Sequence, residues 1–101
     1  MTAYALFILE KLRDQPLFDE YHRVGRKARG THPIKPLAYY GKHEVLEGAA
    51  AEGIVLFEFP TLQAAHAWYD SPQYQQALPL RLRSADCRVI FFEGVADLPQ
   101  A

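Results

Sequence analysis

Three stretches of the chain carry large apolar side chains at both odd and even positions, and this feature limits the folds open to it. The stretches are residues 4–12, 54–59 and 87–95. Each is short and rich in aromatic or branched residues, so we predict three β-strands. A strand with one face in water alternates apolar and polar residues. In residues 4–9, however, Tyr4, Leu6 and Ile8 alternate with Ala5, Phe7 and Leu9. The pattern therefore predicts a sheet that is apolar on both faces.

Two segments between these strands have the apolar spacing of helices. The first follows Asp14 and Pro16, a capping residue and a proline suited to a first helical turn, and should end within residues 30–33. The second follows Thr61, and Ser71 with the next proline opens a short continuation that Pro79 ends or kinks. We expect the inward-facing residues to be Phe18, Tyr21, Val24 or Gly25 and Ala28, then Leu62, Ala65, Trp68 and Tyr69, then Tyr74 and Leu78.

The remaining segments complete the order β-α-β-β-α-β. Residues 36–40 form a second, shorter strand, and residues 41–53 form a long hairpin connection with a brief strand extension at Val45 and Leu46. Two crossovers that share a hairpin give a ferredoxin-like α+β fold, a four-stranded antiparallel sheet with two helices on one face. The length fits one such domain over residues 1–101.

Two helices shelter only one face of that sheet. The other face keeps about six large apolar side chains, each worth about 1.5–3 kcal/mol when buried. An exposed patch of this kind marks an interface. A second copy related by a two-fold axis is the simplest cover, so we predict a homodimer of the dimeric α/β-barrel type. The alternative is that the 41–53 connection or the C-terminal tail folds over this face.

Composition removes several classes of partner. The net charge of -1 argues against nucleic-acid binding. The basic residues between Arg23 and Lys42 are interpreted as a solvated helix face, with an anionic ligand as the alternative. No apolar run reaches the roughly 18 residues of a membrane span, and no secretory leader is evident. Cys87 is the single cysteine, which excludes an intrachain disulfide and favours a cytoplasmic location.

Several motifs resemble a known family. They are the segment 55–60 (VLFEFP), Ala64 and Ala65, the segment 68–75 (WYDSPQYQ), Tyr21, the segment 46–48 (LEG), and Glu93 with Gly94. On these residues the chain resembles the family called domain of unknown function 1330. The resemblance implies the dimeric α/β-barrel superfamily but no reaction, because that family has no established activity. One departure is that residues 34–36 (IKP) stand where the family tends to carry a glycine pair.

Aromatic and polar residues of the predicted helices and strands suggest a ligand pocket between sheet and helices. Trp and Tyr combine apolar bulk with a hydrogen-bonding tip, which suits a pocket wall or a boundary between core and surface. His22 could act as a base near neutral pH or be a partly exposed helix residue. The candidate pocket residues are Tyr21, His22, Tyr39, Glu58, Trp68, Tyr69 and Tyr74, and Arg81 lies near the last of these in sequence.

No motif fixes a catalytic residue or a cofactor. The four histidines are too far apart in sequence for a typical metal site. Glu58 and Glu93 should lie at one end of the sheet, either as a proton-transfer pair or as two solvated carboxylates. Cys87 is interpreted as a buried strand residue. Two hypotheses remain: a small-molecule enzyme or binding protein, and a non-catalytic dimeric structural or stress-related module.

Overall fold

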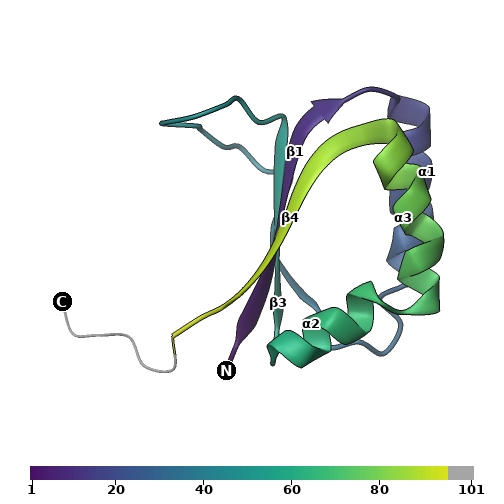
Figure 1. The fold of residues 1–101 in the computed structure, drawn as a ribbon, viewed down its shortest axis with the longest axis vertical. Coiled ribbons are helices and arrows are strands. Elements are labelled where there is room, and N and C mark those ends of the chain that lie inside the picture. Colours follow the sequence, from purple (N-terminus) through teal and green to yellow (C-terminus); the bar gives the residue numbers. More distant parts are fainter. Residues whose placement is uncertain (96–101) are drawn as a thin grey trace.

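The computed structural model describes residues 1–95, which form a four-stranded sheet with helices on one side (Figure 1). Neighbouring strands are antiparallel and lie in the order β2-β3-β1-β4. The ferredoxin-like α+β prediction is confirmed. The elements are β1 (Ala3–Leu12), α1 (Gln15–Lys27), β2 (Lys35–Tyr39), β3 (Gly53–Phe59), α2 (Leu62–Tyr69), α3 (Pro72–Ser84) and β4 (Ala85–Glu93).

One face of the sheet packs against the helices and forms the core. In β1, Ala5, Phe7 and Leu9 are buried, whereas the residues between them are partly exposed. The register places Phe7 opposite Val55 of β3 and Val89 of β4, so the three strands contribute side chains to the same layer.

The opposite face of the sheet is also apolar. It carries partly exposed aliphatic and aromatic side chains from the three longest strands: Tyr4, Leu6, Ile8, Ile54, Leu56 and Ile90, with Phe92 42% exposed. We call this set the open face. Among the described residues, no helix covers it (Figure 1). The connection between β2 and β3 projects away from the helices, and its Leu46 is 88% exposed. The C-terminal tail considered as a cover falls mostly in residues 96–101, outside the described residues.

The structure corrects three details of the prediction. Helix α3 continues through Pro79 to Ser84, which gives three helices rather than two and a short continuation. Its C-terminal half buries Arg81 and Ser84, and this tertiary packing outweighs the local effect of the proline. Val45 and Leu46 form no strand, because no described strand lies beside them. Strand β4 begins two residues earlier than predicted and ends at Glu93.

Candidate functional site

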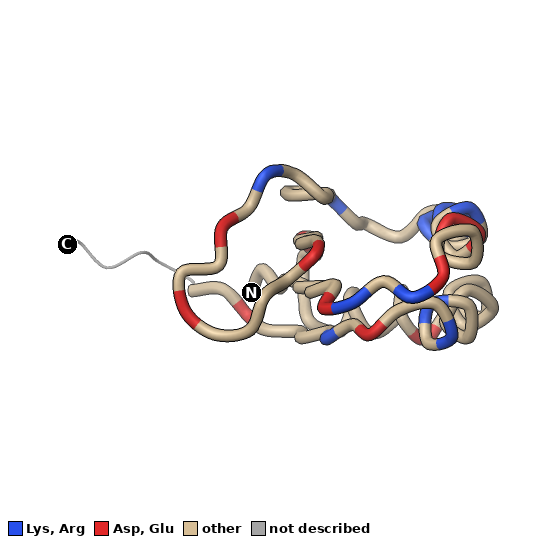
Figure 2. Tube along the Cα trace, turned by 90° about the horizontal axis from the view of Figure 1, so that it is seen from above, with Lys and Arg blue, Asp and Glu red and all other residues tan. Residues whose placement is uncertain are grey.

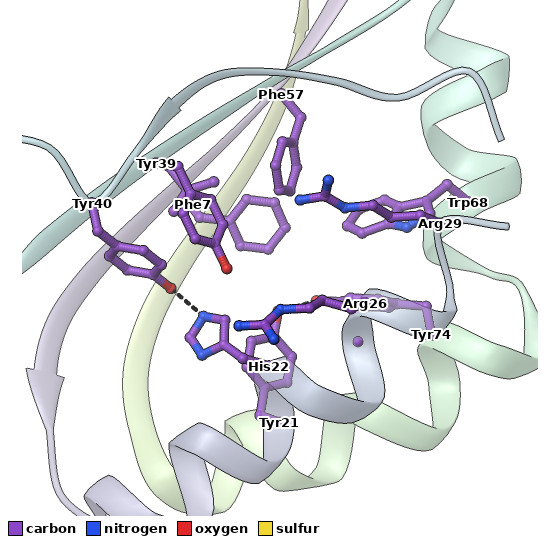
Figure 3. A pocket seen from close by; sticks show the side chains of 12 residues that line it. Phe7, Tyr21, His22, Arg26, Arg29, Tyr39, Tyr40, Phe57, Trp68 and Tyr74 are labelled. Carbon is purple, nitrogen blue, oxygen red and sulfur yellow. Dashed lines mark hydrogen bonds between the residues drawn. The ribbon is translucent and has the colours of Figure 1, made fainter.

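A pocket lies between the inner face of the sheet and α1, and aromatic rings form most of its wall (Figure 3). It encloses about 50 Å³, room for a few water molecules. Residues from β1, β2, β3 and all three helices line it, together with Tyr40 just beyond β2. The seven rings are Phe7, Tyr21, Tyr39, Tyr40, Phe57, Trp68 and Tyr74.

The inner end of the pocket is a packed cluster around Trp68. The Trp68 ring centroid lies 4.5 Å from that of Tyr74 and 5.8 Å from that of Phe57. Phe7 approaches the indole edge-on at 6.1 Å. Such tilted and edge-to-face contacts hold the rings in fixed orientations. The indole Nε1 is buried and has no hydrogen-bond partner among the described residues.

Two tyrosine hydroxyls meet at the floor of the pocket. The Tyr21 and Tyr74 oxygen atoms lie 2.9 Å apart, a buried hydrogen bond that joins α1 to α3. Burial raises the pKa of both phenols, so both remain protonated at neutral pH. One O–H donates to the other oxygen, and the second O–H remains available to a ligand.

His22 and Tyr40 form a second hydrogen-bonded pair at the pocket mouth (Figure 3). His22 Nδ1 lies 3.1 Å from the Phe18 carbonyl oxygen, which can only accept, so Nδ1 carries the proton. In the neutral ring, Nε2 then accepts from the Tyr40 hydroxyl at 2.7 Å. Burial lowers the pKa of His22, and nearby Arg26 lowers it further, which favours this neutral form.

The position of Tyr40 depends on an unusual backbone conformation and on a glycine. Tyr40 has a φ of 56°, in the left-handed region that non-glycine residues seldom adopt. Its ring lies against Gly53, where an added Cβ would come within 2.8 Å of the ring. The glycine therefore permits the close contact that directs the Tyr40 hydroxyl towards His22.

Arginine side chains border the pocket from two sides. Arg26 of α1 and Arg29, just beyond its C-terminus, line it, and the Arg29 guanidinium lies 5.6 Å from the centre of the Phe57 ring. Arg81 of α3 lies behind the floor, only 4% exposed, with its guanidinium 5.9 Å from the centre of the Phe7 ring. Figure 2 shows Lys and Arg on the helices and also on the strands and the β2–β3 connection.

The structure brings together five of the seven residues predicted to line the pocket. They are Tyr21, His22, Tyr39, Trp68 and Tyr74. Tyr69 touches the cluster, with its ring 5.1 Å from that of Tyr74, but it lines a separate surface depression with His66 and Phe91.

Glu58 lies on the side of the sheet opposite to the pocket, so the prediction that it lines the pocket is wrong. It is registered with Tyr4 on the open face, whereas its neighbour Phe57 points into the pocket. Glu93 is registered with Ala3 on the helix side. The two carboxylates therefore occupy opposite faces, which removes the predicted proton-transfer pair.

Sequence reasoning missed Tyr40, Phe57, Arg26 and Arg29 as pocket residues. The available signal for the arginines was their helical spacing from His22, four residues to Arg26 and seven to Arg29, although α1 itself ends at Lys27. Phe57 was identified as apolar, but nothing in the pattern distinguished a pocket residue from core.

Within residues 1–95, no three His, Cys, Asp or Glu side chains gather closely enough to hold a metal ion. The helices of this part of the chain are also too short or too polar to cross a membrane.

Comparison with known proteins identifies the family. The model of the family described as Domain of unknown function (DUF1330) matches residues 2–95. The chain belongs to this family. Comparison with curated proteins gives no match.

Solved structures with similar folds place the DUF1330 chain among ferredoxin-like proteins. A protein of unknown function from Rhodopseudomonas palustris superposes with a TM-score of 0.75 at 15% identity, covering 95% of this chain and 84% of that one. A dimeric ferredoxin-like protein of unknown function from Jannaschia sp. CCS1 gives 0.69 at 17% identity, covering 93% and 100%. SnoaB, a cofactor-independent oxygenase from Streptomyces nogalater, gives 0.58 at 10% identity, covering 98% and 96%. At these identities the similarity concerns the fold.

Proposed function

We propose that this DUF1330 chain binds a small organic metabolite in the aromatic pocket between the sheet and α1. The observation that carries the proposal is the combination of rigid ring walls with polar groups directed at one space. Ligand sites are typically apolar cavities with a few convergent polar groups that fix orientation. Here the convergent groups are the Tyr21–Tyr74 and His22–Tyr40 pairs and the unpartnered Trp68 N–H.

Chemical transformation of the bound molecule is a further part of the proposal. Nε2 of the neutral His22 ring accepts from the Tyr40 hydroxyl, so a proton from the ligand would reach His22 by way of that hydroxyl. The oxygenase from Streptomyces nogalater supports the idea that this fold accommodates chemistry without a cofactor. That support is an analogy of fold, and it assigns no reaction to this chain.

We further propose that the protein is a homodimer joined through the open face. The apolar side chains of that face and the dimeric ferredoxin-like neighbours support this arrangement. The pocket lies on the other side of the sheet, so pairing through the open face leaves its wall of α1 intact. A reducing compartment such as the cytoplasm belongs to the same proposal and is supported by the single cysteine.

A ligand screen tests the binding proposal. The purified protein is melted in the presence of a diverse metabolite panel, and hits are titrated by the fluorescence of Trp68, the only tryptophan. We expect at least one compound to raise the melting temperature and to change this emission. Tyr39→Ala should weaken the hit, because it removes part of the pocket wall. Leu37→Ala, in the same strand but outside the pocket, is the matched control.

The competing candidate is a non-catalytic dimeric module, and the small volume of the pocket favours it. A pocket volume of about 50 Å³ is well below the several hundred Å³ of typical drug-sized ligand sites. In that case no compound changes the melting temperature or the Trp68 emission. Binding proposals and this alternative therefore give opposite results in the same screen.

A further inference from the structure

Two hydrogen-bond donors of the pocket wall have no acceptor among the described residues. The Trp68 N–H is buried without a partner among residues 1–95. Tyr21 and Tyr74 carry two O–H groups, of which their mutual bond uses one. Buried donors in native proteins nearly always meet an acceptor. A ligand that brings acceptor atoms to this part of the pocket would accept from both the Trp68 N–H and the free tyrosine O–H.

The formally charged side chains that line the inner pocket are arginines. No Asp or Glu is among the lining residues, whereas Arg26 and Arg29 both are. Figure 3 shows Arg29 extending towards Phe57 and Arg26 towards His22. Within residues 1–95 the ion pairs are Arg13–Asp86 and Arg23–Glu20, so neither pocket arginine is paired with a carboxylate.

A buried arginine strengthens the positive potential behind the floor. Arg81 is 4% exposed, its Nε has no hydrogen-bond partner, and no described carboxylate pairs with it. Its neighbours are Tyr74 and the face of Phe7. Burial of an unpaired cation is unfavourable, and an anion placed in the pocket would reduce that cost.

We infer that the pocket binds an organic anion with a planar conjugated body, of the aromatic carboxylate class. This inference rests on the proposed function and specifies the chemical class of the ligand. The inner space admits a group of carboxylate size, which meets the free donors of the floor. The planar body lies against the rings and extends into an outer depression of about 280 Å³ that shares His22, Arg26, Tyr39 and Tyr40 with the pocket. Asp19 also borders this depression, which favours insertion with the negative end inwards.

The test uses trans-cinnamate as the anionic probe and cinnamamide as its neutral counterpart of nearly equal shape. Calorimetry gives both affinities at pH 7.5, and the single indole N–H resonance of Trp68 reports whether the probe reaches the floor. We expect cinnamate to bind at least about tenfold more tightly than cinnamamide and to shift the indole resonance, because charge-assisted hydrogen bonds are roughly twice as strong as neutral ones.

Arginine variants assign the effect to the pocket. Arg29→Gln and Arg26→Gln should each weaken cinnamate roughly fivefold or more and leave cinnamamide unchanged. Arg23→Gln is the matched control, because Arg23 lies on the same helix as Arg26 but pairs with Glu20 outside the pocket. This variant should bind cinnamate as the unmodified chain does.

Each other result contradicts the inference in a distinguishable way. Equal affinity for the two probes, or unchanged cinnamate binding in both pocket variants, would show that the site does not select anions. If a neutral compound from the metabolite panel binds at Trp68 and cinnamate does not, the inference is wrong and the proposed function stands. If no compound binds at all, both are wrong.

Discussion

At the scale of single residues, one backbone carbonyl and one tyrosine hydroxyl together define the tautomer of His22. The Phe18 carbonyl fixes the proton on Nδ1, and Tyr40 donates to Nε2. Protonation of the ring would reverse the second bond, because Nε2–H of the cation donates and the Tyr40 oxygen then accepts. The neutral form is favoured by burial of the ring, which lowers the pKa of His22.

The lowered pKa of His22 predicts a pH-dependent stability. Because burial depresses its folded-state pKa below the unfolded value of about 6.5, the neutral form stabilises the fold above that value. This contribution is lost as the pH falls through 6.5 and then through the lower folded-state pKa. Melting temperatures at pH 7.5 and 5.5 check the prediction. The decrease should be larger for the unmodified chain than for His22→Gln, and an equal decrease would contradict it.

The Tyr40–Gly53 contact predicts a position-specific glycine effect. Gly53→Ala places a methyl group within contact distance of the Tyr40 ring, which must move and lose its bond to His22. We expect a loss of about 1–3 kcal/mol in the free energy of unfolding. Gly41→Ala is the control, because its added Cβ meets no atom within 4 Å and the change should stay within about 0.5 kcal/mol. Similar losses in both variants would contradict the contact.

Residue-scale features were the hardest to predict from sequence. Tyr21, His22 and Tyr74 could be placed near a pocket because they follow the apolar stripes of predicted helices. Tyr40 could not, since its position depends on a left-handed backbone and on Gly53, thirteen positions away. Neither the left-handed backbone nor the contact with Gly53 produces a periodic pattern in the sequence.

At the scale of elements, the packing of α1 on α3 builds the floor of the pocket. Gly25 of α1 lies near Ala77 of α3, and an added Cβ there would come 3.9 Å from the Ala77 Cβ. This close approach lets the Tyr21 and Tyr74 hydroxyls meet at 2.9 Å. The two helices thus share a buried polar contact as well as apolar area.

A double-mutant cycle tests that contact. Tyr74→Phe leaves the Tyr21 hydroxyl buried without its partner, so we expect a cost of about 1–3 kcal/mol in unfolding free energy. Tyr21→Phe should cost a similar amount. The double variant should cost less than the sum of the two, because it removes both polar groups together. Chemical denaturation measures all four proteins, and strict additivity would contradict the hydrogen bond.

Element type and order were predictable, but exact lengths and faces were less so. The two-sided apolar pattern correctly indicated the strands. Helix α3 was predicted too short, because Pro79 is a local signal whereas the burial of Arg81 and Ser84 is a tertiary one. The error over Glu58 and Glu93 arose from register, since a difference of one residue moves a side chain to the other face.

At the scale of the whole molecule, the sheet has two different uses. Its inner face and the helices enclose the pocket, and its open face is the proposed dimer interface.

A charged side chain placed on the open face tests whether that face forms the dimer interface. Leu56→Lys places an ammonium group on the open face and should shift the protein towards monomer. Leu82→Lys is the control, because Leu82 is an exposed residue of α3, and this variant should remain dimeric. Size-exclusion chromatography with light scattering compares the variants. An unchanged dimer in Leu56→Lys would locate the interface elsewhere.

In the proposed dimer, a sheet with two apolar faces and helices on only one of them pairs with a second copy of itself. Sedimentation equilibrium of the unmodified chain at micromolar concentration measures the mass of the species in solution. We expect a single species with twice the mass of one chain. A stable species with the mass of one chain would contradict it.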